Sequence, residues 1–308
     1  MKSARTLLVT GGNGFVGKSL QDLLVAKGAD GDWALEALPD GIDIRDSSLA
    51  SFLPAAPPDA VLHLAAVSHV AQSFEEPDQC FDVNFHGTWN LLRALRSSGF
   101  HGRLLYVSSG DCYGAVPEEQ LPVGEDRQLH PRNPYAVSKV AAEALCYQWS
   151  QTEGLDVVIA RPFNHIGPGQ DRRFVIPSFC EQIARIERGK VPPVLLTGNL
   201  DVTRDFTDVN DVLDGYFALL ERGRRGEAYN VASGREYLLR GVLDTLLQMS
   251  RVKAEVRAET GRHRASEQRR VVADITKIHR DTGWAPVVPF ETSLESVLEY
   301  WRRKERDE

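Results

Sequence analysis

The sequence predicts an α/β fold: a doubly wound parallel sheet with a smaller C-terminal domain interleaved with it. Two observations predict this fold. Short apolar runs suited to buried strands alternate with stretches of helical spacing throughout the first half of the chain. A glycine-rich turn also follows the first apolar run and opens directly into a helix, which is typical of a Rossmann-like sheet. Ligands of such sheets bind at the carboxyl ends of the strands.

Composition limits the class of protein. The chain has 308 residues, of which 42% are hydrophobic and 26% are charged, as in an ordinary soluble globular protein of one large domain or two intimate ones. The formal net charge of -7 argues against a nucleic acid or a membrane surface as the main partner. An anionic ligand would therefore need arginines placed locally.

Cysteine usage and the chain start indicate a compartment. The four cysteines form no C-x-x-C pair and lie in no cluster with histidines, so neither zinc nor a disulfide framework is indicated. His63, His86, His101, His130 and His279 also have no partner at metal spacing. Reduced thiols in a cytoplasm are the simplest account. The N-terminus runs directly into a strand-like segment, so we expect no signal peptide, and no apolar stretch is long enough to cross a bilayer.

Residues 6–10 are predicted to form the first strand, and residues 19–26 have the spacing of a helix. Between them, Gly11 permits a tight turn, Gly14 lets a pyrophosphate approach the backbone, and Gly17 lets helix and strand pack closely. The alternative is a glycine-rich turn without a ligand. The strand and helix on either side favour a dinucleotide site.

The second strand is predicted over residues 33–38. It ends at Pro39-Asp40-Gly41 and lacks both the acidic residue that usually binds a ribose 2'-hydroxyl and an arginine for a 2'-phosphate. The choice between NAD and NADP is therefore open. Asp43 can accept a hydrogen bond from an adenine amino group, but an exposed Asp before a turn is an equally good interpretation.

The third strand, residues 60–66, ends in small residues that leave space for a flat ligand. A loop is expected at residues 67–74, a long helix at 81–95, and a strand at 103–107 that leads into Ser109. Ser109 should therefore lie at the carboxyl edge of the sheet.

Tyr135 and Lys139 are four residues apart, so in a helix they share a face. A neighbouring ammonium favours phenolate, which would lower the tyrosine pKa from about 10 toward neutrality and suit proton exchange with an alcohol or ketone. By itself this spacing is weak, because any amphipathic helix can contain it.

Four motifs in order strengthen that interpretation: T-G-G-N-G-F-V-G, H-L-A-A, Y-V-S-S-G-D-C-Y-G and N-P-Y-A-V-S-K. Together they resemble the extended short-chain dehydrogenase/reductases that act on nucleotide sugars. The resemblance implies that Tyr135 donates or accepts the proton, that Lys139 holds the nicotinamide ribose, and that Ser109 hydrogen-bonds the substrate oxygen. The cofactor-binding residues it implies for NAD or NADP are Gly11, Gly14, Phe15, Val16, Gly17, Asp43, Ile44, Leu64, Ala65, Ala66, Tyr135, Lys139, Pro162 and His165.

The middle and C-terminal segments are similar to GDP-mannose 4,6-dehydratases and to GDP-4-keto-6-deoxy-D-mannose reductases. In the dehydratases a Glu just after the catalytic Ser or Thr serves as an extra base, but here those positions are Gly110 and Asp111. A base misplaced by about 1 Å can cost about a hundredfold in rate. We therefore expect NAD(P)H-dependent reduction of the C4 ketone of GDP-4-keto-6-deoxy-D-mannose to GDP-D-rhamnose. The alternatives are a 4,6-dehydratase, a 4-epimerase, and a non-catalytic dinucleotide-binding protein.

The same resemblance implies a set of residues that bind the GDP-sugar. Arg204 and Arg264 would take the diphosphate, because arginine forks suit phosphate oxygens. Arg264 lies in a basic run that is as often a solvated face. The full set is Ser68, Ser109, Asp111, Asn164, Val175, Arg204, Arg264 and Glu267.

The remaining segments suggest how the chain is divided. Residues 1–162 and 203–232 are predicted to form the dinucleotide-binding domain, and residues 163–202 and 233–308 the substrate domain. Helices are expected at 174–186, 208–220, 238–249 and 294–302, and strands at 194–196, 228–231 and 254–256. A homodimer, common in the family, would use the helices after Phe81 and Tyr135, although their apolar faces are equally suited to the core.

Overall fold

The computed structural model describes residues 5–27, 33–39, 41–250, 252–259 and 268–307. At its centre lies a six-stranded sheet in the order β10-β5-β4-β3-β1-β2, with every neighbouring pair parallel. The predicted doubly wound sheet is confirmed. Its strands are β1 (Arg5–Thr10), β2 (Trp33–Ala37), β3 (Ala60–His63), β4 (Arg103–Val107), β5 (Asp156–Pro162) and β10 (Ala228–Val231).

Strand order places the binding crevice. From β1 the chain first adds β2 on one side and then returns to add β3 on the other. This reversal leaves a crevice at the carboxyl ends of β1 and β3, where open α/β sheets bind their ligands.

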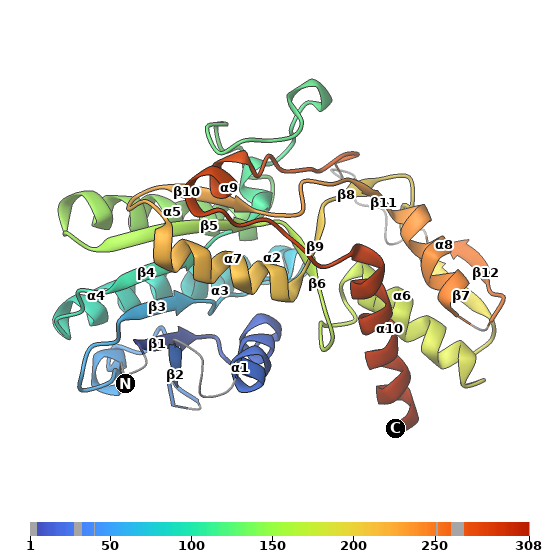
Figure 1. Cartoon of the computed structure of the whole chain (residues 1–308), viewed down its shortest axis with the longest axis horizontal. Helices are drawn as coiled ribbons and strands as arrows, with labels where there is room; N and C mark the ends of the chain where they lie inside the picture. Colours follow the sequence, from blue (N-terminus) through green and yellow to red (C-terminus); the bar gives the residue numbers. More distant parts are fainter. Residues whose placement is uncertain (1–4, 28–32, 40, 251, 260–267, 308) are drawn as a thin grey trace.

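Helices cover both faces of the sheet (Figure 1). Alternate residues of a strand point to opposite faces, so Leu7 packs with α1 (Phe15–Lys27) and α7 (Val209–Arg222). Leu8 packs with α4 (Thr88–Ser97) and α5 (Pro134–Thr152) on the other face. Burial on both faces explains why the strands read as continuous apolar runs.

The helix predicted at 81–95 is more complex than its spacing indicates. The chain forms α3 (Pro77–Phe81), then a π-helical segment, Asp82–Gly87, and then α4. Asn84, in the π-helical segment, accepts a hydrogen bond from the backbone N–H of Val67 at 2.8 Å and donates to Ser138 at 2.9 Å. A buried polar side chain thus joins the loop after β3 to α5.

The loop predicted at 67–74 is wrong in part, because α2 (Val70–Glu75) forms there. His69 caps this helix: its Nδ1 accepts from the backbone N–H of Gln72 at 3.3 Å. A histidine N-cap is not among the usual signals of a helix start, which explains why the sequence did not reveal it. Three short 3₁₀ segments, Leu49–Phe52, Gly110–Tyr113 and Glu118–Gln120, also fall in stretches without a regular pattern.

A second group of elements lies beside the sheet, on the right of Figure 1. Its apolar core joins helices and a strand that are distant in the sequence, including Ile176, Leu195, Leu243 and Leu298. The elements are α6 (Val175–Glu187), β7 (Val194–Thr197), α8 (Leu239–Met249), β12 (Glu255–Ala258) and α10 (Phe290–Asp307). The predicted helices and strands in this part are all present, although α10 is longer at both ends than expected.

Two short strand pairs and one helix join the two groups. β6 (Asn164–Ile166) pairs with β9 (Phe206–Asp208), β8 (Thr203–Arg204) pairs with β11 (Tyr237–Leu238), and α9 (Thr276–Thr282) returns to β10. Ile278 and Trp284 pack in the cluster that covers the sheet. We therefore propose the predicted division of the chain with residues 276–284 assigned to the dinucleotide-binding part. No helix in the described ranges combines the length and apolarity needed to cross a membrane.

Candidate active site

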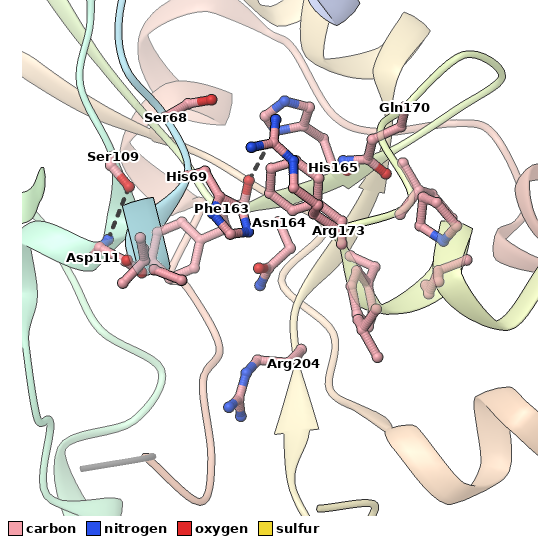
Figure 2. Close-up of a pocket in the computed structure, with 18 of the residues that line it drawn as sticks. Ser68, His69, Ser109, Asp111, Phe163, Asn164, His165, Gln170, Arg173 and Arg204 are labelled. Atoms are coloured by element: carbon pink, nitrogen blue, oxygen red, sulfur yellow. Dashed lines mark hydrogen bonds between the residues drawn. The ribbon is translucent and has the colours of Figure 1, made fainter. Parts of the chain in front are cut away.

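A large cleft lies between the carboxyl edge of the sheet and the second group of elements. Its volume is about 2060 Å³, against roughly 300–1,000 Å³ for a pocket that holds one small ligand. In Figure 2, Ser68, Ser109 and Asp111 lie on one side of this cleft, and His165, Gln170 and Arg173 on the other. The cleft is large enough for two ligands side by side.

The glycine turn forms one end of the cleft. Gly11 has a φ of +74°, and a Cβ there would lie 2.6 Å from the backbone N of Ala65. A Cβ on Gly17 would lie 2.5 Å from the backbone O of Gly12. On Gly14, by contrast, a Cβ would meet only the backbone O of Gly11, at 3.3 Å. Packing within the chain explains why Gly11 and Gly17 are glycines. The space over Gly14 fits a ligand that approaches the backbone beside the N-terminus of α1.

Local sequence places Tyr135 and Lys139 at the start of α5. Asn133 caps the helix by accepting from the backbone N–H of Ala136 at 2.7 Å, and Pro134 occupies the first turn, where its missing N–H has no cost. Tyr135 and Lys139 both line the cleft. The Lys139 ammonium donates to the backbone O of Val107 at 2.9 Å, which anchors it to the end of β4.

The expected lowering of the Tyr135 pKa by Lys139 is wrong in this structure. Burial raises the pKa of Tyr135 well above its usual value, and the nearby Asp111 carboxylate adds to this, while a hydrogen bond with Ser109 opposes it. Burial also lowers the pKa of Lys139 to about 8. The phenol is therefore protonated at neutral pH and stands ready to donate its proton.

Ser109 begins the 3₁₀ turn Gly110–Tyr113 and caps it, accepting from the backbone N–H of Asp111 at 3.1 Å (dashed in Figure 2). A Cβ on Gly110 would lie 2.9 Å from the ring of Phe163. Position 110 therefore has no room for a side chain unless Phe163 moves, and Asp111 supplies the carboxylate nearest to Tyr135 in this turn.

The opposite wall contains His165 and Asn164. His165 stacks on Phe15, with ring centroids 6.0 Å apart and planes 4° apart, and its Nδ1 donates to the backbone O of Phe163 at 3.0 Å. Burial lowers the pKa of His165, so its imidazole is neutral. Asn164 donates to the backbone O of Asp205 at 3.2 Å, which fixes its amide at the cleft wall.

Most of the predicted site residues meet in this cleft. They are Gly11, Gly14, Phe15, Val16, Gly17, Leu64, Ala65, Ala66, Ser68, Ser109, Asp111, Tyr135, Lys139, Pro162, Asn164, His165, Val175 and Arg204. Arg204 also donates to the backbone O atoms of Thr203 and Gln268, at 2.7 and 3.0 Å. Their roles toward a ligand stay predictions.

Two predicted residues, Asp43 and Ile44, do not line the cleft. Asp43 pairs with the guanidinium of Arg45 at 2.6 Å, which lowers the pKa of its carboxyl group. Ile44 is buried in the core, where its side chain fills the space beside Gly87. Arg264 and Glu267 lie outside the described residues.

Several cationic residues of the cleft were not among the predicted site residues. Seven cationic side chains line it within the described part of the chain, against three carboxylates. The cations are Arg132, Lys139, Arg172, Arg173, Arg185, Arg204 and Arg257, and the carboxylates are Glu75, Asp111 and Glu181. Only the fold collects these arginines, because they come from separate segments. Their excess charge suits anionic ligands in a protein that is acidic overall.

Comparison with known proteins agrees with this arrangement. The family described as GDP-mannose 4,6 dehydratase matches residues 40–297. A GDP-6-deoxy-D-mannose reductase from Pseudomonas aeruginosa is 47% identical over 303 residues, covering 98% of this chain and 99% of the relative.

Two solved structures extend the comparison. RMD from Pseudomonas aeruginosa, complexed with NADPH, gives a TM-score of 0.91 at 45% identity over 97% of this chain and 100% of that chain. A dTDP-glucose 4,6-dehydratase from Streptomyces venezuelae, with NAD bound, gives 0.79 at 29% identity over 98% of each chain. Since the family match spans most of the chain, the protein belongs to the extended short-chain dehydrogenase/reductases, in the GDP-mannose 4,6 dehydratase family.

Proposed function

We propose that this protein is an NAD(P)H-dependent oxidoreductase that reduces the C4 ketone of GDP-4-keto-6-deoxy-D-mannose to GDP-D-rhamnose. The observation that carries the proposal is the meeting of Ser109 and Tyr135, a hydroxyl and a protonated phenol, in the lining of one cleft together with Lys139. The 47% identity to a GDP-6-deoxy-D-mannose reductase supports the substrate. The NADPH complex of RMD supports the cofactor.

The residues divide the work of the reaction. Gly14 and Lys139 would hold the reduced dinucleotide, which would supply the hydride to C4. Ser109 and Tyr135 hydrogen-bond the ketone oxygen and draw electron density toward it, and Tyr135 then donates its proton to the forming alkoxide. Lys139, held by the backbone O of Val107, places a positive charge beneath this exchange.

The dehydratase alternative demands more than this cleft offers in the Gly110–Tyr113 turn. Loss of water from C5 and C6 needs an added base and acid. In this turn Gly110 has no side chain and no space for one, and Asp111 is one methylene shorter than the Glu of dehydratases. Ketone reduction needs neither group, which favours the reductase.

One assay separates these reactions. The purified chain is mixed with GDP-4-keto-6-deoxy-D-mannose and NADPH or NADH, and nicotinamide absorbance is followed. Stoichiometric loss of the reduced cofactor with formation of GDP-D-rhamnose is expected. No loss of cofactor, together with turnover of GDP-mannose, would assign the protein to the dehydratases, and interconversion at C4 without net cofactor use would assign it to the epimerases.

We propose in addition that the chain forms a homodimer through α4 and α5 in the cytoplasm. Trp89 on α4 is 46% exposed and Tyr147 on α5 is 54% exposed, so each of these helices presents a large aromatic side chain that a second copy could cover. All four cysteines are buried and unpaired, in keeping with a reducing compartment. Light scattering after gel filtration should give twice the chain mass, and Trp89→Glu should halve it; a monomeric wild type would refute the dimer.

A further inference from the structure

A buried polar network lies behind the cleft, around the guanidinium of Arg161 on β5. Arg161 donates to the two carboxylate oxygens of Glu143, from Nε at 3.0 Å and from Nη2 at 2.7 Å. Its Nη1 donates to the hydroxyl of Tyr113 at 3.0 Å, and that hydroxyl donates to Oδ1 of Asn230 at 2.7 Å. All four side chains are buried, with Asn230 fully excluded from solvent.

The network fixes the direction of each hydrogen bond. The amide nitrogen of Asn230 donates to the backbone O atoms of Val123 and Asp274, at 2.9 and 3.1 Å, so its Oδ1 must face Tyr113. The Tyr113 hydroxyl then has one acceptor for its proton and one donor, Arg161, for a lone pair. A tyrosine held on both sides in this way has little freedom to shift.

Two segments that bear catalytic candidates meet in this network. Tyr113 ends the 3₁₀ turn that Ser109 caps, and its ring lines the cleft beside Phe163, with centroids 6.2 Å apart. Glu143 lies on α5 four residues after Lys139, on the same face of the helix. The hydrogen bonds through Arg161 therefore tie the Ser109 turn to the helix that contains Lys139.

We infer that Tyr113 is a positioning residue, whose hydroxyl, held by Arg161 and Asn230, sets the distance between Ser109 and the Tyr135–Lys139 helix. Ser109 and Tyr135 must reach the same substrate oxygen, and a misplacement of about 1 Å can cost about a hundredfold in rate. Stability alone accounts poorly for the network, because a buried ion pair can often be replaced by apolar side chains without loss. This inference rests on the proposed function.

Tyr113→Phe tests the inference, because it keeps the ring at the cleft and removes only the hydroxyl. We expect kcat to fall by about tenfold to a hundredfold, with KM for the keto sugar and Kd for NADPH within about threefold of wild type. The matched control is Tyr229→Phe on β10. The Tyr229 hydroxyl also has two partners, the backbone N–H of Arg224 at 3.0 Å and Asp281 at 3.1 Å, but Tyr229 does not line the cleft. The kcat of Tyr229→Phe should stay within about twofold of wild type.

Asn230→Ser tests the positioning role of Tyr113 independently, and it replaces Tyr113→Phe as the test if that variant does not fold. It removes the acceptor of the Tyr113 hydroxyl, so kcat should again fall with KM unchanged. The double variant should lose no more than the larger single loss, because both changes release the same side chain.

Two results would overturn the inference: a kcat for folded Tyr113→Phe within twofold of wild type, or single losses that multiply in the double variant. Failure of the proposed function is seen separately, in the wild type. If wild type catalyses another nucleotide-sugar reaction, the same variants are compared on that reaction.

Discussion

Tyr135 shows how one side chain can be suited to reduction. Its phenol is buried, and burial disfavours the charged phenolate, so the proton stays on the oxygen near neutral pH. Ser109 opposes this shift and lowers the pKa of Tyr135, which would ease the transfer of the proton. A donor held in this form is what an alkoxide needs as charge accumulates on it.

Tyr135→Phe should lower kcat by about a hundredfold or more, since a positioned general acid contributes about 10²–10⁴ to a rate. NADPH affinity, measured by fluorescence titration, should change less than threefold, because the ring stays in place. Tyr147→Phe on the same helix is the control: Tyr147 does not line the cleft and the variant keeps its ring, so kcat should be unchanged. Equal turnover by Tyr135→Phe and wild type would remove the assigned role.

The pKa of Lys139 should set the upper pH limit of activity. Burial lowers its pKa from 10.5 to about 8, so the ammonium loses its proton as the pH rises through this value. We expect kcat/KM to fall above pH 8, measured as a pH profile with saturating NADPH. In Lys139→Arg the residual activity should not show this decline, because a guanidinium stays charged. A wild-type profile that is flat to pH 9.5 would contradict the assignment.

The same shift has a consequence for stability, with a defined sign. The folded pKa of Lys139 lies below its unfolded value, so between pH 8 and 10.5 the unfolded chain binds more protons than the folded chain. The contribution of Lys139 to the free energy of unfolding therefore rises with pH in this window. Below pH 8 both states are protonated, and the full cost of burying the ammonium is present.

At the scale of elements, the glycines between β1 and α1 have two different roles: some are needed for packing, and one leaves space for a ligand. A side chain on Gly11 or Gly17 would strike backbone atoms at less than 3 Å, whereas one on Gly14 would meet a single oxygen at 3.3 Å. Packing within the chain therefore requires glycine at positions 11 and 17. Gly14 leaves room that a pyrophosphate can use.

Gly14→Ala should therefore fold normally and bind poorly. We expect a free energy of unfolding, from urea titration, within about 1 kcal/mol of wild type, and an NADPH Kd raised at least about tenfold. Gly17→Ala is the contrast, with a loss of about 1–3 kcal/mol from overpacking. If Gly14→Ala bound NADPH as tightly as wild type, the pyrophosphate would have to lie elsewhere.

Long apolar segments of this protein could be predicted from its sequence, and short or irregular elements could not. Apolar runs and spacing gave the strands β1, β2, β3, β4, β7, β10 and β12 and the helices α6, α8 and α10. The π-helical segment depends on Asn84 reaching Val67 and Ser138, and α2 depends on a cap from His69. Such contacts leave no periodic trace.

The site divides in the same way. Gly11, Tyr135 and Lys139 stand at fixed spacings within single segments, so short motifs and the family resemblance that they carry could identify them. Arg185 and Arg257 reach the cleft only because α6 and β12 pack beside it. The sign of the Tyr135 pKa shift was also missed, since burial depends on the whole fold and outweighs the neighbouring charge.

For the whole molecule, charge is distributed unevenly between cleft and surface. The chain carries a net charge of -7, yet cations outnumber carboxylates along the cleft within the described residues. Long-range repulsion and local attraction therefore act together on an anionic ligand. Salt screens both effects, with a Debye length of about 10 Å at 0.1 M. Contacts between a bound diphosphate and the cleft are screened less where they are buried than where they are open to solvent.

If guanidinium groups of the cleft hold the diphosphate, as proposed, GDP binding should weaken as salt rises, because these groups are partly open to solvent. We expect the calorimetric Kd of wild type to increase between 50 and 500 mM NaCl, on the order of tenfold. Arg204→Gln should raise the Kd about tenfold at low salt and flatten the salt dependence. Arg240→Gln is the matched control: Arg240 pairs with Asp201 at 2.9 Å on the surface and does not line the cleft. An Arg204→Gln variant that binds GDP like Arg240→Gln, with the salt dependence of wild type, would exclude Arg204 from the diphosphate site.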